Sequence, residues 1–188
     1  MSNSIGLIDN NFLENIDTEY KSYLLGWIAA CGIIVENQIS IESNQQNFEI
    51  IEILRDIISR DIPIRKDGNL ISFIISSAKM TEDVINHLDW PLSFPRSIKD
   101  QLKWHFVRGY FDCAGFISIK NGYTICVIGS HRLSMLEELN DFCGGKGEIH
   151  DEVCEWNDAN ALEFLSRMYN NAKIFLQRKH DTFSGVGI

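Results

Sequence analysis

Two nine-residue segments of the chain follow the same pattern: Leu24-Leu25-Gly26-Trp27-Ile28-Ala29-Ala30-Cys31-Gly32 and Val107-Arg108-Gly109-Tyr110-Phe111-Asp112-Cys113-Ala114-Gly115. Each comes after a helical pattern with a start signal, which is Asp17 for the first and Ser97 with Asp100, in capping-box spacing, for the second. Each ends at a glycine, the residue that most easily adopts the left-handed conformation after a helix. We therefore expect both segments to form the last turns of helices.

The elements that follow the two segments also recur. After the first, the sequence predicts a hairpin over residues 33–41, an amphipathic helix near 50–58, a hairpin that turns at 66–69 and a helix over 81–88. After the second, it predicts strands over 116–120 and 123–128, a helix over 133–142, strands within 147–156 and a helix near 162–168. Each half therefore has the order α-β-β-α-β-β-α.

This duplication predicts an α+β fold with pseudo-twofold symmetry and sets the domain boundaries. Residues 1–16 form an N-terminal arm, 17–90 the first repeat, 91–96 a linker, and 97–188 the second repeat with a C-terminal tail, all within one compact unit. The two prolines of the connecting stretch, Pro91 and Pro95, prevent one continuous helix across it. The arm segment 5–13 echoes the letters of the repeated motif but lacks the strands that follow it.

Small residues recur at a spacing of four in both predicted helices. Gly26 and Ala30 lie on one face of the first helix, and Gly109 and Cys113 lie on one face of the second. Faces of this kind allow two helix backbones to approach closely. We expect these four residues to form the helix interface of a pseudo-dimeric monomer.

With these residues, the chain resembles the LAGLIDADG homing endonucleases in their single-chain, two-motif form. The resemblance extends from about Glu19 to Phe183, and the stretch 165–183 is similar to the family's terminal helix and basic tail. It implies two motif helices side by side, an acidic residue from the end of each at a metal-binding cleft, and two four-stranded antiparallel sheets that form a saddle over DNA.

The chain departs from this family where the metal would bind. The eighth motif position, which carries the metal-binding carboxylate in active members, is Cys31 in the first motif and Ala114 in the second. Mg²⁺ prefers hard oxygen ligands, whereas a thiol is a soft ligand and a methyl group is none. We therefore expect no catalytic residues, no metal site and no cofactor, and Mg²⁺ only if the protein were a nuclease after all.

Asp112, at the sixth position of the second motif, is the acid that remains, and its counterpart in the first motif is Ala29. A shift by two residues to the eighth position would turn it by roughly 200° at about 3.6 residues per turn, away from the cleft. A structural carboxylate that accepts hydrogen bonds is the favoured interpretation.

The charge balance argues against autonomous binding to nucleic acid. The 188 residues include 17 Lys and Arg against 26 Asp and Glu, a net charge of -9, and phosphate contacts need the opposite excess. The predicted polar face of the saddle has the same acidic bias, with candidates Glu36, Gln38, Ser40, Glu42, Lys66, Ser118, Lys120, Thr124, His150, Glu152 and Glu155.

The possible nucleic-acid contacts are Lys66, Lys120, Arg178 and Lys179. A residual basic patch could include Arg96, Lys99, Lys103, Arg108, Arg167 and Lys173.

Cysteine and aromatic residues are interpreted as core residues. The five cysteines are odd in number and lack Cys-x-x-Cys spacing, which favours free thiols in a reducing compartment, the cytoplasm or the nucleus. Trp27, Trp90, Trp104 and Trp156, with Tyr110 and Phe111, are expected in the core or at an interface. No apolar run reaches the roughly 20 residues of a membrane-spanning helix.

Three functions remain at this point. The favoured one is a catalytically inactive relative of the homing endonucleases, kept as a binding or scaffold module in a protein or nucleoprotein assembly. The first alternative is a non-cleaving, sequence-specific regulator that binds DNA or RNA. The second is an active DNA endonuclease with a rearranged metal site.

Overall fold

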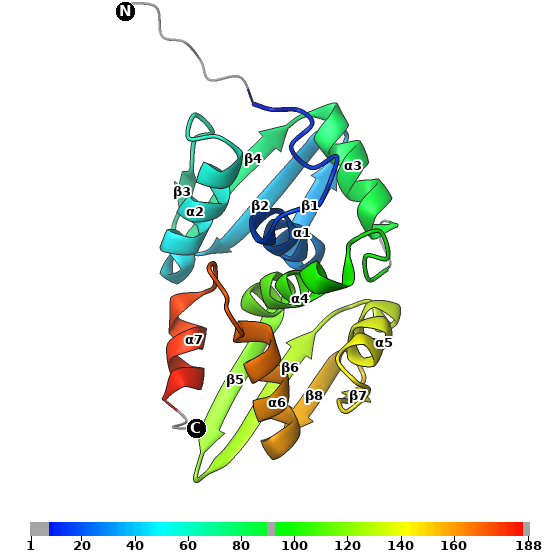
Figure 1. Cartoon of the computed structure of the whole chain (residues 1–188). Helices are drawn as coiled ribbons and strands as arrows, with labels where there is room; N and C mark the ends of the chain where they lie inside the picture. The colour runs from blue at the N-terminus through cyan, green and yellow to red at the C-terminus, as the bar shows by residue number, and fades with distance from the viewer. Residues whose placement is uncertain (1–7, 90–92, 186–188) are drawn as a thin grey trace, which may run out of the picture.

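The two motif segments end two helices that cross the middle of the molecule. A computed structural model describes residues 8–89 and 93–185. In it α1 (Glu19–Cys31) and α4 (Asp100–Ala114) lie side by side between the two halves (Figure 1). Parts of the predicted arm and linker, and Trp90, fall outside the described residues.

The predicted order of elements is confirmed in both repeats. The first repeat continues with β1 (Gly32–Val35), β2 (Gln38–Asn44), η1 (Gln45–Asn47), α2 (Phe48–Ile58), β3 (Arg65–Asp67), β4 (Leu70–Ser76) and α3 (Ala78–Leu88). The second continues with β5 (Gly115–Lys120), β6 (Tyr123–Gly129), α5 (Leu133–Phe142), β7 (Glu148–His150), β8 (Val153–Asn157), α6 (Asp158–Tyr169) and α7 (Gln177–Ser184). Helix α3 begins three residues earlier than predicted because the Ser77 hydroxyl caps it, accepting from the Met80 amide at 3.2 Å.

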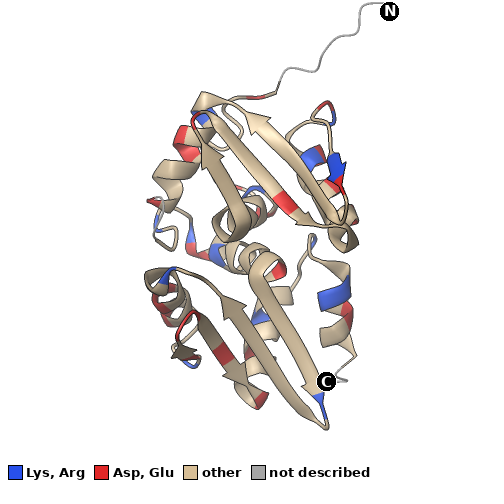
Figure 2. Cartoon of the chain, turned by 180° about the vertical axis from the view of Figure 1, so that it is seen from behind, with Lys and Arg blue, Asp and Glu red and all other residues tan. Residues whose placement is uncertain are grey.

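Each repeat builds one four-stranded antiparallel sheet. The strand orders are β1-β2-β4-β3 and β5-β6-β8-β7, so the two sheets have equivalent topology. The registers also correspond, since Gly32 pairs with Ile41 and Gly115 with Ile128. Helices cover one face of each sheet (Figure 1), and the opposite face is open when the molecule is seen from behind (Figure 2). The predicted α+β, pseudo-twofold arrangement with two antiparallel sheets is thus confirmed.

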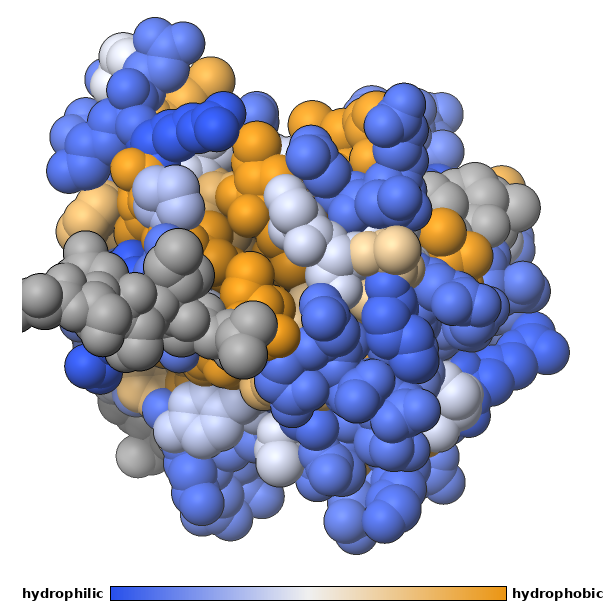
Figure 3. Space-filling model, turned by 90° about the horizontal axis from the view of Figure 1, so that it is seen from above, coloured by the Kyte–Doolittle hydropathy of each residue, from blue (hydrophilic) through white to orange (hydrophobic). Residues whose placement is uncertain are grey.

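Alternate strand residues and the motif helices fill a core shared by both halves. Trp27 and Trp156 are fully buried, as are Tyr110 and Phe111, and Trp104 is half-buried against the Phe142 ring. The prediction that these aromatic residues belong to the core is confirmed. Seen from above, hydrophobic side chains gather in a hollow of the first repeat, and hydrophilic ones surround it (Figure 3). Within the described residues, no helix is long and apolar enough to cross a membrane.

The helix ends differ from the sequence-based expectation in their details. Thr18 rather than Asp17 caps α1, with its hydroxyl accepting from the Lys21 amide at 3.3 Å, and Lys99 precedes α4 without a side-chain cap. Gly32 and Gly115 have φ values of -69° and -97°, so they are extended and not left-handed. Glycine is needed there for space, because an added Cβ would lie 2.5 Å from the Ile28 carbonyl oxygen or 2.3 Å from the Phe111 ring.

The described part of the arm packs against the first repeat. Leu13 is fully buried and Ile16 nearly so. The Ser77 hydroxyl donates to Asn10 Oδ1 at 2.8 Å, and a ring nitrogen of His87 lies 2.9 Å from the Leu13 carbonyl oxygen. These residues therefore close one end of the core.

Candidate site at the paired motif helices

Backbone contact between α1 and α4 places the two helix ends next to each other. An added Cβ on Gly26 would lie 2.2 Å from the Phe106 carbonyl oxygen, and one on Gly109 would lie 2.1 Å from the Tyr23 carbonyl oxygen. No real side chain tolerates such distances, so only glycine permits this approach. The Ser22 hydroxyl adds a buried hydrogen bond to the Leu102 carbonyl oxygen at 2.7 Å.

The last turns of the two helices bring sulfur and methyl groups together. Cys31, Cys113 and Ala114 are half-buried there. The Cys31 thiol donates to the Trp27 carbonyl oxygen at 3.3 Å. The neighbouring Cys31 side chain, together with burial, raises the pKa of the Cys113 thiol well above its ordinary value. All five cysteines are free thiols.

A cavity of about 410 Å³ is lined by Ala29 and Ala30 of α1, by Ala114 of α4 and by the loop after β6. Glu152 is the one carboxylate among its described lining residues, and its Oε2 lies 3.0 Å from His131 Nδ1. Across the described parts of the chain, no group of three or more His, Cys, Asp and Glu side chains could hold a metal ion. The donors at the helix ends, the soft sulfurs of Cys31 and Cys113 and no carboxylate, do not fit Mg²⁺, Mn²⁺ or Ca²⁺.

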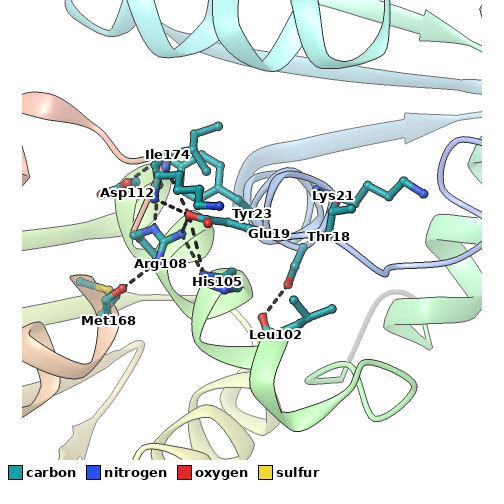
Figure 4. Close-up of polar contacts among 12 residues, drawn as sticks. Thr18, Glu19, Lys21, Tyr23, Leu102, His105, Arg108, Asp112, Met168 and Ile174 are labelled. Atoms are coloured by element: carbon teal, nitrogen blue, oxygen red, sulfur yellow. Dashed lines mark hydrogen bonds and ion pairs between the residues drawn. The ribbon is translucent and has the colours of Figure 1, made fainter. Parts of the chain in front are cut away.

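Asp112 is fully buried and points away from these helix ends. Its Oδ2 accepts from the Tyr23 hydroxyl at 2.7 Å (Figure 4). The same oxygen accepts from the Leu176 amide at 2.7 Å, and Oδ1 accepts from the Tyr169 hydroxyl at 3.2 Å. Burial raises the pKa of Asp112, while Lys179 and the donors act in the opposite direction. The carboxylate connects α4 to α1, to α6 and to the segment before α7.

Arg108 forms a second buried network of hydrogen bonds. Its side chain is fully buried and is not part of a basic patch. Its guanidinium donates to the Ile174 and Met168 carbonyl oxygens at 2.7 and 2.8 Å, and it pairs with Glu19 at 2.6 Å (Figure 4). Glu19 also accepts from the Lys173 amide at 2.7 Å. The possible patch role of Arg108 is thus corrected, because a buried, fully engaged guanidinium cannot contact phosphate.

Lys179 also lies in the interior, against the expectation of a nucleic-acid contact. Its ammonium donates to the carbonyl oxygens of Phe111, Asp112 and Gly115 at 2.6, 3.0 and 2.5 Å. It therefore caps the carboxyl end of α4, where a positive charge is favourable. Burial lowers the pKa of Lys179 to about 8. Its three donors are engaged and cannot reach a phosphate.

The remaining basic candidates divide between the two faces. Lys66 pairs in register with buried Ile71 and lies over the Phe48 ring at 4.2 Å, so it lies on the helix side of the sheet. Arg178 is also on the helix side, where its Nε donates to Asn47 at 3.2 Å. Lys120 pairs with Tyr123 on the open face, as expected.

The strand register removes one predicted residue from the open face and adds one that was not predicted there. Thr124 is buried and not part of the polar face. Arg65, which pairs with Ser72 on the open face, was missed. A three-residue strand next to a turn is too short for alternation to reveal which residue faces outward.

Comparison with known proteins identifies the fold. No protein-family model matches the sequence, and no curated protein matches it. A structure of I-DmoI with DNA and Ca is 16% identical, covers 93% of this chain and 99% of its own, and has a TM-score of 0.66. I-SmaMI with uncleavable DNA is 12% identical, with 90% of each chain covered and a TM-score of 0.62. The LAGLIDADG meganuclease I-AabMI with uncleaved DNA is 14% identical, with 90% of each chain covered and a TM-score of 0.60. The chain thus has the single-chain, two-motif LAGLIDADG fold.

Proposed function

We propose that this protein is a non-cleaving binding module built on the LAGLIDADG homing-endonuclease fold, retained in a protein or nucleoprotein assembly. One observation carries the proposal: the paired helices end in Cys31 and Ala114, where carboxylates would be needed to hold a divalent ion. Hydrolysis of a phosphodiester with metal ions requires them to clamp the attacking and leaving oxygens. Without ligands at these two positions the clamp has no anchor.

Asp112 does not replace the missing ligands. To reach the cleft it would have to give up its bonds to Tyr23, Tyr169 and the Leu176 amide. Hydrogen bonds to a charged group contribute about 1.5–3 kcal/mol each, so the rearrangement would cost a large part of a domain's stability. The buried position supports a structural role for this carboxylate.

The part of the fold that holds the two halves together is intact. Gly26 and Gly109 still permit backbone contact, and the C-terminal segment is tied to both motif helices through Asp112 and Arg108. A scaffold with a rigid centre and two exposed sheets suits binding. Its five free thiols suit a reducing compartment.

A non-cleaving regulator that binds DNA or RNA is the second candidate. Two observations favour it: the solved structures of I-AabMI and I-DmoI are bound to DNA, and Arg65 and Lys120 lie on the open face. An active nuclease would have to work from the cavity with Glu152 and His131, an ion pair that is exposed to solvent.

Metal binding tests the proposal directly. We would titrate Mn²⁺ into the native protein and into the double variant Cys31→Asp/Ala114→Asp, with Cys31→Asn/Ala114→Asn as the uncharged control of equal size. The native protein and the asparagine control should show no saturable binding by calorimetry, whereas the aspartate pair should gain it. Saturable Mn²⁺ binding by the native protein, together with duplex cleavage that a chelator stops, would overturn the proposal.

A further inference from the structure

The open faces of the two sheets present apolar side chains where a nucleic-acid-binding surface would be polar. On the first sheet, Ile33 and Val35 of β1 are 50% and 60% exposed, and Leu70 of β4 is 52% exposed. On the second sheet, Phe116 of β5 and Tyr123 of β6 are 62% and 64% exposed. Each of these five side chains is thus at least half exposed, and exposed apolar residues that lie next to one another mark interaction sites.

Strand register joins these side chains into apolar rows. Phe116 pairs with half-buried Val127, and Ile33 and Ile74 flank Ser40 from the two neighbouring strands. Paired residues share a sheet face, so each row projects from the open side. Together these residues define the apolar saddle face: Ile33, Val35, Leu70, Ile74, Phe116, Tyr123, Ile125, Val127 and Val153.

The two motif segments place the first apolar residue of each sheet next to the end of a motif helix. Ile33 and Phe116 each come directly after the glycine that follows a motif helix, Gly32 or Gly115. They occupy equivalent places in β1 and β5, each opposite the second strand of its sheet. The apolar saddle face therefore includes equivalent contributions from both repeats, next to the helix ends.

Charged side chains on the same face are mainly acidic. Register places Glu42, Asp67, Glu148 and Glu155 there, against Arg65 and Lys120. In Figure 2 the strands are largely uncharged, with isolated acidic positions along them and basic ones at the margins. Uncharged polar side chains such as Gln38, Ser40 and Ser118 share this face. A phosphate backbone would therefore meet apolar groups, neutral polar groups and more carboxylates than basic groups, which gives little attraction and little release of counterions.

We infer that the apolar saddle face binds a protein segment that presents apolar side chains flanked by Lys or Arg. This inference rests on the proposed function, and it specifies the partner of the binding module. Charge complementarity selects this occupant, because basic side chains pair with Glu42, Asp67, Glu148 and Glu155. A second copy of the chain would bring the same carboxylates and a net charge of -9 against its own.

The experiment uses the full chain and two defined probes: a displayed library of random peptides and a library of random DNA duplexes, both selected at physiological salt. The variants are Phe116→Ser and Tyr123→Ser on the apolar saddle face. The control is Ile85→Ser on α3, a side chain that is 38% exposed on the helix side. Circular dichroism and thermal unfolding establish that each variant is folded.

We expect the peptide library to yield ligands rich in apolar and basic residues. Their dissociation constants should rise roughly tenfold or more with Phe116→Ser, and Tyr123→Ser should weaken them less because its side chain lies near the sheet's end. Ile85→Ser should leave the dissociation constants unchanged. Glu155→Lys should lower the association rate, as removal of an attractive charge does.

Two results would overturn the inference. One is a peptide selection that yields no ligand sensitive to Phe116→Ser. The other is enrichment of duplexes that bind tightly with a steep salt dependence. The second result would leave the non-cleaving function standing with DNA as the partner, whereas metal-dependent cleavage of the same duplexes would refute the proposed function itself.

Discussion

The carboxyl ends of α1 and α4 derive from the same motif but are held in different ways. At the sixth motif position α1 has Ala29 and α4 has Asp112, whose three hydrogen bonds reach α1, α6 and the segment before α7. The end of α4 is also capped by Lys179, whereas in α1 the described bonds at the end are local, such as that from Cys31 to Trp27.

This difference shows where the pseudo-symmetry was retained and where it was lost. Both helices have the glycine that allows backbone contact. The α4 backbone fills the space that a side chain on Gly26 would need, and the α1 backbone fills the space that one on Gly109 would need. The second helix alone carries buried charges, because the C-terminal segment packs on it and needs polar partners. A buried carboxylate or ammonium is stable only when its hydrogen bonds are made.

The largest effect is expected from a substitution that disrupts the backbone contact between α1 and α4. Gly109→Ala puts a Cβ 2.1 Å from the Tyr23 carbonyl oxygen, so the helices must separate. We expect a loss of roughly 3 kcal/mol or more in the free energy of unfolding, measured by chemical denaturation. The control is Gly129→Ala, where the nearest atoms lie at 3.9 Å. Equal stability of the two variants would contradict the backbone contact.

An intermediate effect is expected where the two ends differ. Asp112→Asn places an amide group against donors from Tyr23, Tyr169 and the Leu176 amide, and leaves at least one of them unpaired. The free energy of unfolding should fall by about 1–3 kcal/mol. Tyr169→Phe removes only the 3.2 Å bond and should cost less, and exposed Tyr20→Phe serves as the control. A stability unchanged by Asp112→Asn would exclude the structural role.

The smallest effect concerns the reactivity of the cysteine thiols in the native protein, and its test involves no substitution. Burial raises the pKa of Cys126 and Cys154 to about 12 and that of Cys143 further, so their thiolates are scarce near neutral pH. We expect iodoacetamide to modify the half-buried Cys31 first in the native protein, as followed by peptide mass spectrometry. Full unfolding in denaturant should make all five rates similar. Rapid native modification of Cys126 would show that the core beneath the second sheet opens easily.

Residues whose role is local were predictable, and those whose role depends on distant segments were not. The spacing of four between Gly26 and Ala30, and between Gly109 and Cys113, indicated a close helix contact because helical periodicity is a property of neighbouring residues. Arg108, Lys179 and Lys66 resemble surface basic residues in the sequence, yet two are buried and one lies over Phe48 on the helix side. Their basic side chains indicated charge but not which carbonyl or ring they contact.

The order of elements, the duplication and the absence of a carboxylate at Cys31 and Ala114 follow from residue identity and short-range spacing, which operate within a turn or a strand. The docking of the C-terminal segment follows only from the folded chain, since Lys179 meets Phe111 and Asp112 meets Leu176 across long stretches of sequence. The apolar character of the open face also needed the strand register, because a shift by one residue exchanges the two faces of a sheet. Local patterns encode secondary structure, whereas burial and pairing depend on which segments are brought together.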